Sequence, residues 1–162
     1  MYSINIPLSA IEMYQAGCAG MMRRLDAIKK TRKGLFAPNA VWDTDIEAAG
    51  AEMVVAKWLG RYWHALANDP TVLEGDVGKY QVRHTRHENG CLVIYQKDKD
   101  DAVFVLVVGG YPNYMITGWL PGDRAKQKQY WRDNAQHPAY FVPQDALLDP
   151  TDLEMSVKCR EL

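Results

Sequence analysis

The chain has 162 residues, of which 48% are apolar and 24% charged, and its formal net charge at pH 7 is −1. This size and composition are typical of a single soluble domain that buries its own core without disulfide or metal staples. The near-zero net charge excludes binding of nucleic acid through overall positive charge, so any basic surface has to come from local clustering.

The cysteines and the apolar segments indicate where the protein resides. Cys18, Cys91 and Cys159 are odd in number, far apart and in no CxxC pair, which argues against a disulfide framework and a structural zinc site. The N-terminus has no charged segment followed by a long apolar run, and no stretch reaches the ~18–20 apolar residues of a membrane span. We therefore expect a cytoplasmic protein that does not enter the membrane.

The first predicted helix, at residues 9–33, begins at a capping box and ends in a basic segment. Ser9 is expected to cap this helix, with Glu12 reaching back to it. The last eleven residues carry six cations against one acid, Asp26, a local net charge of +5 that exceeds what the helix dipole favours. We interpret the surplus as a nucleic-acid-binding patch, with a solvated helix face as the alternative. The six cations are Arg23, Arg24, Lys29, Lys30, Arg32 and Lys33.

A second capping box, from Thr44 to Glu47, predicts a central helix at residues 45–65. Its most informative residue is Glu52, because the neighbours one helical turn away, such as Ala48 and Ala56, are small and apolar. A carboxylate in such surroundings is either partly buried and paired, or it faces a functional site. A boundary glutamate that reaches out to water is the alternative.

The rest of the chain predicts four strands, a short polar helix and an irregular tail with a final short strand. The third of these strands is continuously apolar, as expected for a central buried strand. We therefore predict one domain over residues 1–162 with its core at residues 44–133. The expected ranges are 80–84, 91–96, 102–108 and 114–120 for the strands, 124–133 for the helix and 134–162 for the tail.

A set of oxygen-bearing groups around the first of these strands predicts a metal site. Gln81 and Arg83 share one face of the strand while Val82 points to the other, toward the core. Asp76 joins the face of Gln81 if a turn at Gly78 shifts the strand parity. The carboxylates of Glu52 and Asp76, the Gln81 side-chain oxygen and the Val82 carbonyl would then suit Mg²⁺ or Mn²⁺. The alternative is that Asp76 caps its own loop.

This order of residues resembles the PD-(D/E)xK nuclease superfamily, in which a helical Glu and an Asp precede a strand with a Glu/Gln-x-Lys triplet. The matching residues here are Glu52, Asp76, Gln81 and Arg83, and the resemblance spans residues 46–119. The resemblance implies an α/β (α+β) domain of restriction-endonuclease-like fold. In this chain, the expected strands would form a mixed β-sheet of four to five strands flanked by helices.

The resemblance also implies a function, with two departures, of which the first is Gln81 in place of the commoner acid, which leaves one fewer negative charge for the metal. It implies a metal-dependent nuclease that hydrolyses phosphodiester bonds in nucleic acid, foremost DNA, with Glu52, Asp76, Gln81 and Arg83 as the catalytic residues. Arg83 replaces the usual lysine; arginine stays protonated, so it orients phosphate but cannot act as a base. The alternatives are a catalytically inactive nuclease fold that binds DNA or a protein partner, and an unrelated interaction domain. Because members of this family commonly act as assemblies, the resemblance also implies a homodimer or a protein complex.

Overall fold

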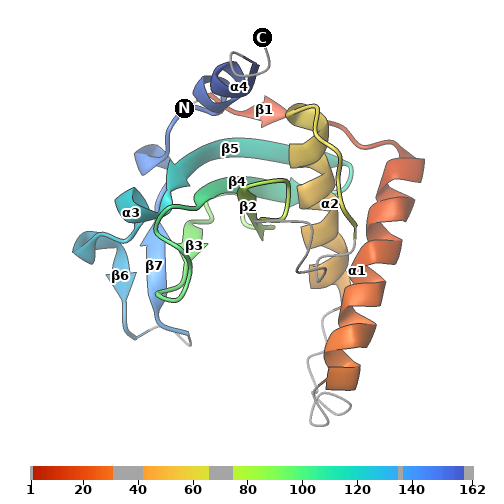
Figure 1. Ribbon diagram of the computed structural model, residues 1–162, viewed down its shortest axis with the longest axis horizontal. Coiled ribbons are helices and arrows are strands. Elements are labelled where there is room, and N and C mark those ends of the chain that lie inside the picture. The colour runs from red at the N-terminus through yellow and green to blue at the C-terminus, as the bar shows by residue number, and fades with distance from the viewer. Residues whose placement is uncertain (1, 31–41, 66–74, 135–136, 159–162) are drawn as a thin grey trace.

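A long helix packs on one face of a mixed four-stranded sheet, a second long helix packs along the first, and a three-stranded sheet packs against the other face (Figure 1). The computed structural model describes residues 2–30, 42–65, 75–134 and 137–158. The predicted mixed α+β class, with a sheet flanked by helices, is confirmed. Across the described ranges, every helix is too short or too polar to cross a bilayer.

The first helix, α1 (Ala10–Lys30), begins at the predicted capping box. The Ser9 N–H donates to Glu12 Oε2 at 2.6 Å, and the Glu12 N–H donates to Ser9 Oγ at 3.3 Å. α1 packs closely along α2 (Trp42–Trp58), where Gly20 permits the approach: a Cβ there would lie 2.6 Å from the Asp45 carbonyl oxygen. The predicted end of this helix, residues 31–33, lies outside the described residues.

The second helix starts earlier than predicted because the expected capping box does not close. Thr44 already lies in the first turn of α2, and its N–H donates to Asp43 Oδ1 at 3.0 Å. Glu47 turns instead toward the sheet, where its Oε2 accepts the Tyr114 hydroxyl at 2.6 Å. The acid assigned to capping therefore ties α2 to the sheet.

The second helix also stops earlier, at Trp58 and not near residue 65. Gly60, which the sequence pattern placed inside the helix, adopts a φ of +62°. The N–H of Arg61 bonds back to the Ala56 carbonyl at 2.8 Å, as in a glycine-based C-cap. The left-handed glycine ends the helix and turns the chain back toward α1.

The four-stranded sheet has the strand order β1-β5-β4-β2, with β2 parallel to β4 and the other pairs antiparallel. The central strand β4 is buried, as predicted, and its side chains alternate between two cores. Val105 and Val107 pack with α2, whereas Phe104 and Leu106 pack with the three-stranded sheet. The strands are β1 (Ile4–Asn5), β2 (Tyr80–Thr85), β4 (Val103–Gly110) and β5 (Asn113–Pro121).

The chain after β5 differs from the prediction. Two short helices and a strand replace the expected helix at 124–133. The tail, expected to be irregular with a final short strand, contains a short strand but ends in a helix. Strand β7 lies between β3 and β6, and four residues are too few for a periodic pattern to be recognised. These elements are β3 (Leu92–Ile94), α3 (Gly122–Ala125), η2 (Lys128–Tyr130), β6 (Trp131–Arg132), β7 (Ala139–Val142), η3 (Gln144–Ala146) and α4 (Pro150–Lys158).

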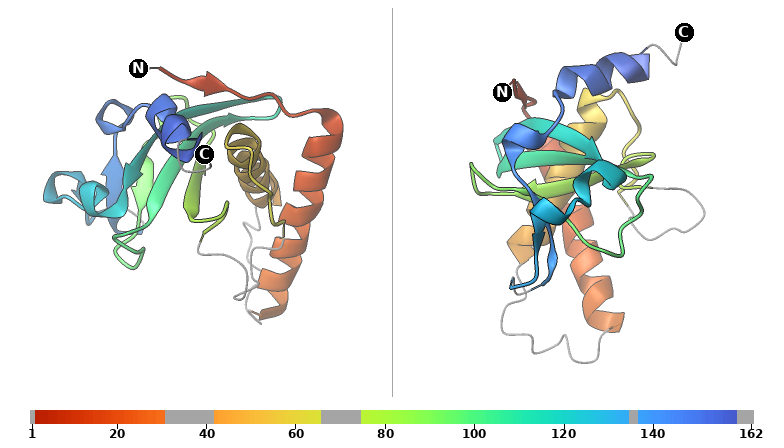
Figure 2. Two further views of the ribbon diagram at one scale, coloured as in Figure 1. Left: turned by 45° about the horizontal axis from the view of Figure 1, so that its top comes forward. Right: turned by 90° about the vertical axis from the view of Figure 1, so that its left-hand side faces the viewer.

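The motif strand β2 lies between the helical pair and the three-stranded sheet. Figure 2 shows this arrangement in a second orientation, with α1 and α2 at one end of the molecule and β3, β6 and β7 at the other. In the described part of the chain, β2 is also the edge strand of its sheet. Side chains from both ends of the molecule therefore reach it.

Candidate functional site

The predicted face pattern of β2 is confirmed. Val82 is buried in the core shared with α2, whereas Gln81 and Arg83 are half-buried on the opposite face. Gln81 and Arg83 thus lie side by side on one surface of the edge strand, as the strand periodicity requires.

Asp76 reaches β2 because the chain doubles back in front of the strand. Val77 and Tyr80 exchange two main-chain hydrogen bonds of 3.1 Å, and Gly78 adopts a φ of +60° in the turn between them. Asp76 then lies along β2, and its Oδ2 accepts the Val82 N–H at 2.7 Å. The turn at Gly78 brings Asp76 alongside β2, where the acid holds its own loop against the strand.

Glu52 is paired and does not reach out to water. Its side chain lies on α2 with 7% of the residue exposed, and both its oxygens accept hydrogen bonds from Arg23 of α1 at 2.6 Å. The Trp63 indole N–H donates to the same carboxylate at 3.1 Å. Arg23 also donates to the Ala65 carbonyl at 3.2 Å, so the segment after α2 is held over the ion pair.

The two motif carboxylates belong to one electrostatic cluster. Burial raises the pKa of Glu52, and the negative charge of Asp76 raises it further, although the Arg23 guanidinium opposes both effects. Burial likewise raises the pKa of Asp76, against the Val82 N–H and the charges of Arg83 and Arg23. Both carboxyl groups are therefore more readily protonated than free carboxyl groups.

Arg83 is held on three sides. Its Nη2 donates to Asp98 Oδ2 at 2.9 Å, its Nε donates to the Val93 carbonyl at 3.2 Å, and its guanidinium carbon lies 5.1 Å from the centre of the Phe104 ring. The Nη1 contact with the Val82 carbonyl is the longest, at 3.4 Å. The motif arginine is therefore oriented by the protein before any ligand binds.

The predicted metal ligands lie around β2 but on different sides of it: Glu52 is on α2, Gln81 faces away from α2, and Asp76 lies along the strand with its Oδ2 on the Val82 N–H. Hard oxygen donors of this kind fit Mg²⁺, which needs only one or two carboxylates because waters and substrate oxygens complete its shell. Asp76 is the carboxylate next to the strand. Glu52 becomes available only if Arg23 releases it, and no group of three or more His, Cys, Asp or Glu side chains suited to a metal occurs in the described segments.

The six cations proposed as a nucleic-acid-binding patch divide into three kinds. Arg23 and Arg24 turn toward α2, where they pair with Glu52 and Asp45. Lys29 is exposed. The side chain of Lys30, and Arg32 and Lys33, lie outside the described residues. The two arginines thus stabilise the helix pair, which the excess of positive charge in the sequence does not reveal.

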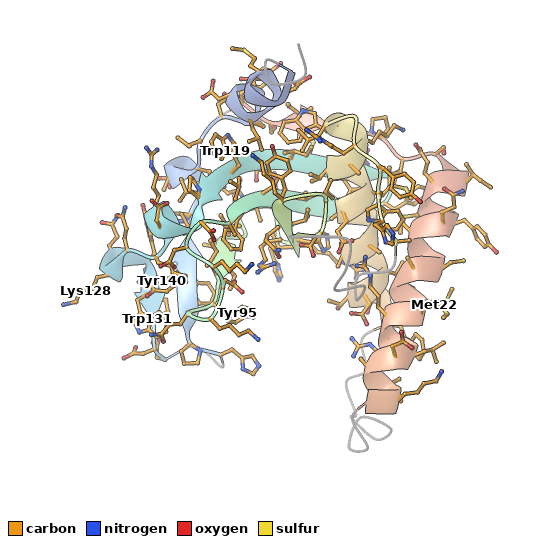
Figure 3. All side chains as sticks on the ribbon, viewed as in Figure 1. Met22, Tyr95, Trp119, Lys128, Trp131 and Tyr140 are labelled. Carbon is orange, nitrogen blue, oxygen red and sulfur yellow. The ribbon has the colours of Figure 1, made fainter. Side chains whose placement is uncertain are left out.

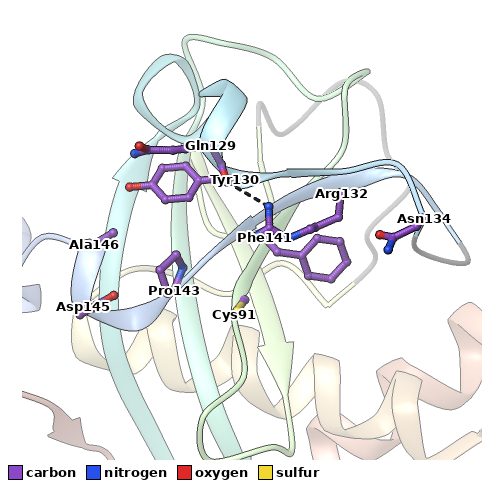
Figure 4. Close-up of a pocket in the computed structure, with 9 residues that line it drawn as sticks. All are labelled: Cys91, Gln129, Tyr130, Arg132, Asn134, Phe141, Pro143, Asp145 and Ala146. Atoms are coloured by element: carbon purple, nitrogen blue, oxygen red, sulfur yellow. Dashed lines mark hydrogen bonds between the residues drawn. The ribbon is translucent and has the colours of Figure 1, made fainter.

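Two adjoining pockets open beside Arg83. The first, of about 590 Å³, runs along β2 and is lined by His84, His87 and Asn89. The second, of about 810 Å³, shares Cys91 and Phe141 with the first. Figure 4 shows its outer wall, where Tyr130, Arg132 and Asn134 surround the opening. The residues of this surface come from separate segments of the chain, which the second sheet brings together.

The chain was also compared with known proteins. The comparison with protein-family models, with curated protein sequences and with solved structures finds no match.

Proposed function

We propose that this protein is a metal-dependent nuclease that hydrolyses phosphodiester bonds in nucleic acid, with DNA as the foremost substrate. The observation that carries the proposal is the position of Asp76, a half-buried carboxylate that lies along the motif strand with its Oδ2 on the Val82 N–H at 2.7 Å. Burial raises the pKa of Asp76, and the charges of Arg83 and Arg23 act on it in the opposite direction. Acids perturbed in this way are typical of functional sites.

The cofactor in this proposal is Mg²⁺ or Mn²⁺. Asp76, the Gln81 side-chain oxygen and the Val82 carbonyl would hold the ion, with Glu52 as a further ligand after Arg23 withdraws. When bound, such an ion neutralises charge on the scissile phosphate and lowers the pKa of an attacking water.

Arg83 has an electrostatic role in this proposal. Its planar guanidinium suits a phosphate group, and because Asp98 and Phe104 already fix it, little side-chain entropy is lost on binding. The Nη1 nitrogen makes the longest of the Arg83 contacts, 3.4 Å, so its hydrogens are the most available to a phosphate oxygen. Since arginine stays protonated, Arg83 stabilises developing negative charge and does not accept a proton.

The two pockets beside Arg83 support nucleic acid as the substrate. His87 offers a ring nitrogen beside β2, and Arg132 adds a positive charge at the second pocket, whereas His84 Nε2 is already bonded to the Gly109 carbonyl at 2.6 Å. The rings of Phe141 and Tyr130 line the second pocket, where they can stack on unpaired bases.

A second candidate function is nucleic-acid binding without cleavage. The observation that favours it is that Arg23 occupies both oxygens of Glu52 at 2.6 Å, so a permanent internal cation stands where a metal ligand was predicted. In this alternative, the site keeps the nuclease arrangement but binds nucleic acid, or a protein partner, through its arginines.

We also propose that the protein is located in the cytoplasm. Cys18 and Cys91 are free thiols, and free thiols are characteristic of a reducing compartment.

The test is cleavage of plasmid, single-stranded DNA and RNA with Mg²⁺, Mn²⁺ or EDTA. The variant is Asp76→Asn, which keeps an acceptor for the Val82 N–H and removes the charge; the control is Asp101→Asn, at an exposed acid. We expect metal-dependent cutting that Asp76→Asn abolishes and Asp101→Asn preserves. Binding without cutting in all three proteins would favour the second candidate, and the absence of both binding and cutting would refute both.

A further inference from the structure

Phe141 lies in the middle of the three-stranded sheet, on the face that points away from the core. Its neighbour in β7, Tyr140, turns the other way and packs against the core, where its ring centre lies 4.9 Å from that of Trp131 (Figure 3). Successive side chains of a strand alternate between the two faces of a sheet, so Phe141 points outward. Its half-buried ring lines both of the adjoining pockets and is therefore accessible to a ligand.

Three side chains form a row across this outward face. Val93 of β3 pairs directly with Phe141, and Arg132 of β6 pairs with Ala139, two residues before Phe141 and on the same face. We call Val93, Phe141 and Arg132 the outer row; it crosses three strands, a distance of about 10 Å. An arginine stands at each end, because Arg83 of β2 donates to the Val93 carbonyl at 3.2 Å, at the edge of the sheet opposite to β6.

Arg132 is exposed and is oriented by neutral groups. Its Nη1 donates to the Gln129 carbonyl at 3.0 Å and to the Trp131 carbonyl at 2.9 Å, and Figure 4 shows the first of these bonds. The guanidinium has five N–H donors, and these two bonds use a single nitrogen without cancelling its charge. Asp145, the acid that lines the same pocket, stands on the opposite wall (Figure 4). An anionic group is therefore attracted to the Arg132 end of the pocket.

An aromatic ring between two arginines matches the chemistry of a nucleic-acid strand. The flat face of a base stacks on an aromatic ring, and the phosphate of each nucleotide pairs with arginine. In a duplex, the bases stack on one another and present only their edges in the grooves. Phe141 is recessed between two pockets of about 590 and 810 Å³, so a base reaches its ring only when that base is unpaired.

We propose that the outer row binds a single strand of nucleic acid, with one unpaired base stacked on Phe141 and a neighbouring phosphate on Arg132. A strand in this position extends over Val93 and reaches Arg83 at the other end of the row. This inference rests on the proposed function and names its substrate class: single-stranded nucleic acid is bound in preference to duplex. Phe141 and Arg132 determine this preference and have no part in the chemical step.

The first test measures binding of a labelled oligothymidylate of about ten nucleotides by fluorescence anisotropy, in EDTA so that no metal-dependent cleavage occurs. We expect Phe141→Leu, which keeps an apolar side chain but removes the ring, to weaken binding about tenfold. Phe141→Tyr, which keeps the ring, should bind like the wild type. The control is Tyr62→Ala, which removes a ring that is 84% exposed after α2 and should not change the affinity. Equal binding by Phe141→Leu and the wild type, or a wild type that does not bind, would overturn the proposal.

The second test separates charge from stacking through the dependence of affinity on salt. Each phosphate that is neutralised on a single strand contributes about 0.7 to the slope of log affinity against log salt. Arg132→Gln should therefore weaken binding and reduce this slope by about 0.7, whereas Phe141→Leu should leave the slope unchanged. Arg124→Gln, at an exposed arginine of α3, is the control and should match the wild type. An unchanged slope in Arg132→Gln would refute the phosphate contact.

Competition identifies the ligand. Unlabelled single strand should displace the labelled oligonucleotide, whereas a stable blunt duplex and thymidine monophosphate at the same nucleotide concentration should not. Equal displacement by the duplex would refute the preference for unpaired bases. Equal displacement by the monophosphate would refute binding of a strand and show that the pocket takes a free nucleotide.

The outcome is independent of cleavage, because binding is measured without metal. A protein that shows this binding but does not cut with Mg²⁺ would refute the nuclease and leave the outer row as a single-strand site. A protein that cuts single strands and duplex at equal rates, with Phe141→Leu as active as the wild type, would refute the outer row and leave the nuclease.

Discussion

Arg23 and Glu52 form a bidentate ion pair between α1 and α2, with both nitrogen–oxygen distances at 2.6 Å and only 7% of Glu52 exposed. The pair joins the basic helix to the helix that carries the motif acid. It is at once a packing contact and an obstacle to a metal ion at Glu52.

We predict that Arg23→Met lowers the free energy of unfolding by about 3 kcal/mol, because it leaves the buried Glu52 carboxylate without its counter-charge. The double variant Arg23→Met/Glu52→Met should lose less than the single variant, since no charge then remains buried. Urea unfolding of both variants and of Glu52→Met completes the double-mutant cycle. A loss below about 1 kcal/mol for Arg23→Met would contradict the buried pair.

A second prediction concerns pH. The pKa of Glu52 and that of Asp76 are both raised by burial above their ordinary values of 4.5 and 3.8. The folded state therefore binds more protons than the unfolded state in weakly acidic solution, and the contribution of these groups to stability falls as pH rises through that range. Asp76→Asn removes one of these groups, so its stability should increase relative to the wild type as the pH rises above about 4.

Urea titrations at a series of pH values measure this difference. Asp101→Asn serves as the control, because this acid is exposed, and its stability should follow that of the wild type. If the stability curve for Asp76→Asn also runs parallel to that of the wild type, then burial does not raise the pKa of Asp76 in solution.

A third prediction uses two glycines of α1 as a matched pair. Gly20→Ala should destabilise the protein by about 1–3 kcal/mol, because the new Cβ would meet the backbone of Asp45 at 2.6 Å. At Gly17 the nearest atom to a new Cβ is Ile46 Cγ2, at an ordinary 3.8 Å. Gly17→Ala should therefore be neutral or stabilise by about 0.5–1 kcal/mol through helix propensity. Thermal unfolding compares the two, and equal effects would contradict the close helix contact at Gly20.

A fourth prediction tests the role of Arg83 in the proposed reaction. Arg83→Gln should reduce the single-turnover rate of metal-dependent cleavage by about 10²-fold, as expected when one group that stabilises transition-state charge is lost. Arg124→Gln, at an exposed arginine of α3, should leave the rate unchanged. A rate for Arg83→Gln within a factor of two of the wild type would show that Arg83 does not take part in the reaction.

The sequence was most informative where a local pattern determines structure. The alternation of Tyr80, Gln81, Val82 and Arg83 predicted which side chains face the core, and the Ser9–Glu12 capping box appears as expected. Both patterns depend on residues within one turn or one strand, so the sequence contains all the information needed.

The parts that could not be predicted depend on contacts between distant segments. Arg23 and Glu52 are 29 positions apart on different helices, and Arg83 and Asp98 are separated by a strand and two turns. Nothing in the spacing of these residues selects one partner over another. The role of Gly60 was misjudged for a related reason: a glycine within a helical pattern is compatible with both continuation and termination, and the packing around it decides between them.

The hydrogen bond from the Val82 N–H to Asp76 has a further consequence for solubility. β2 is an edge strand in the described structure, and the free N–H groups of edge strands invite pairing with a strand of another molecule. The loop that carries Asp76 folds back along β2, and the Asp76 carboxylate accepts a hydrogen bond from the Val82 N–H at 2.7 Å. The loop and its negative charge therefore block this edge. Asp76, which we propose takes part in the reaction, therefore also protects the edge of the sheet from aggregation. A variant at this position without a hydrogen-bond acceptor would lose activity and become less soluble.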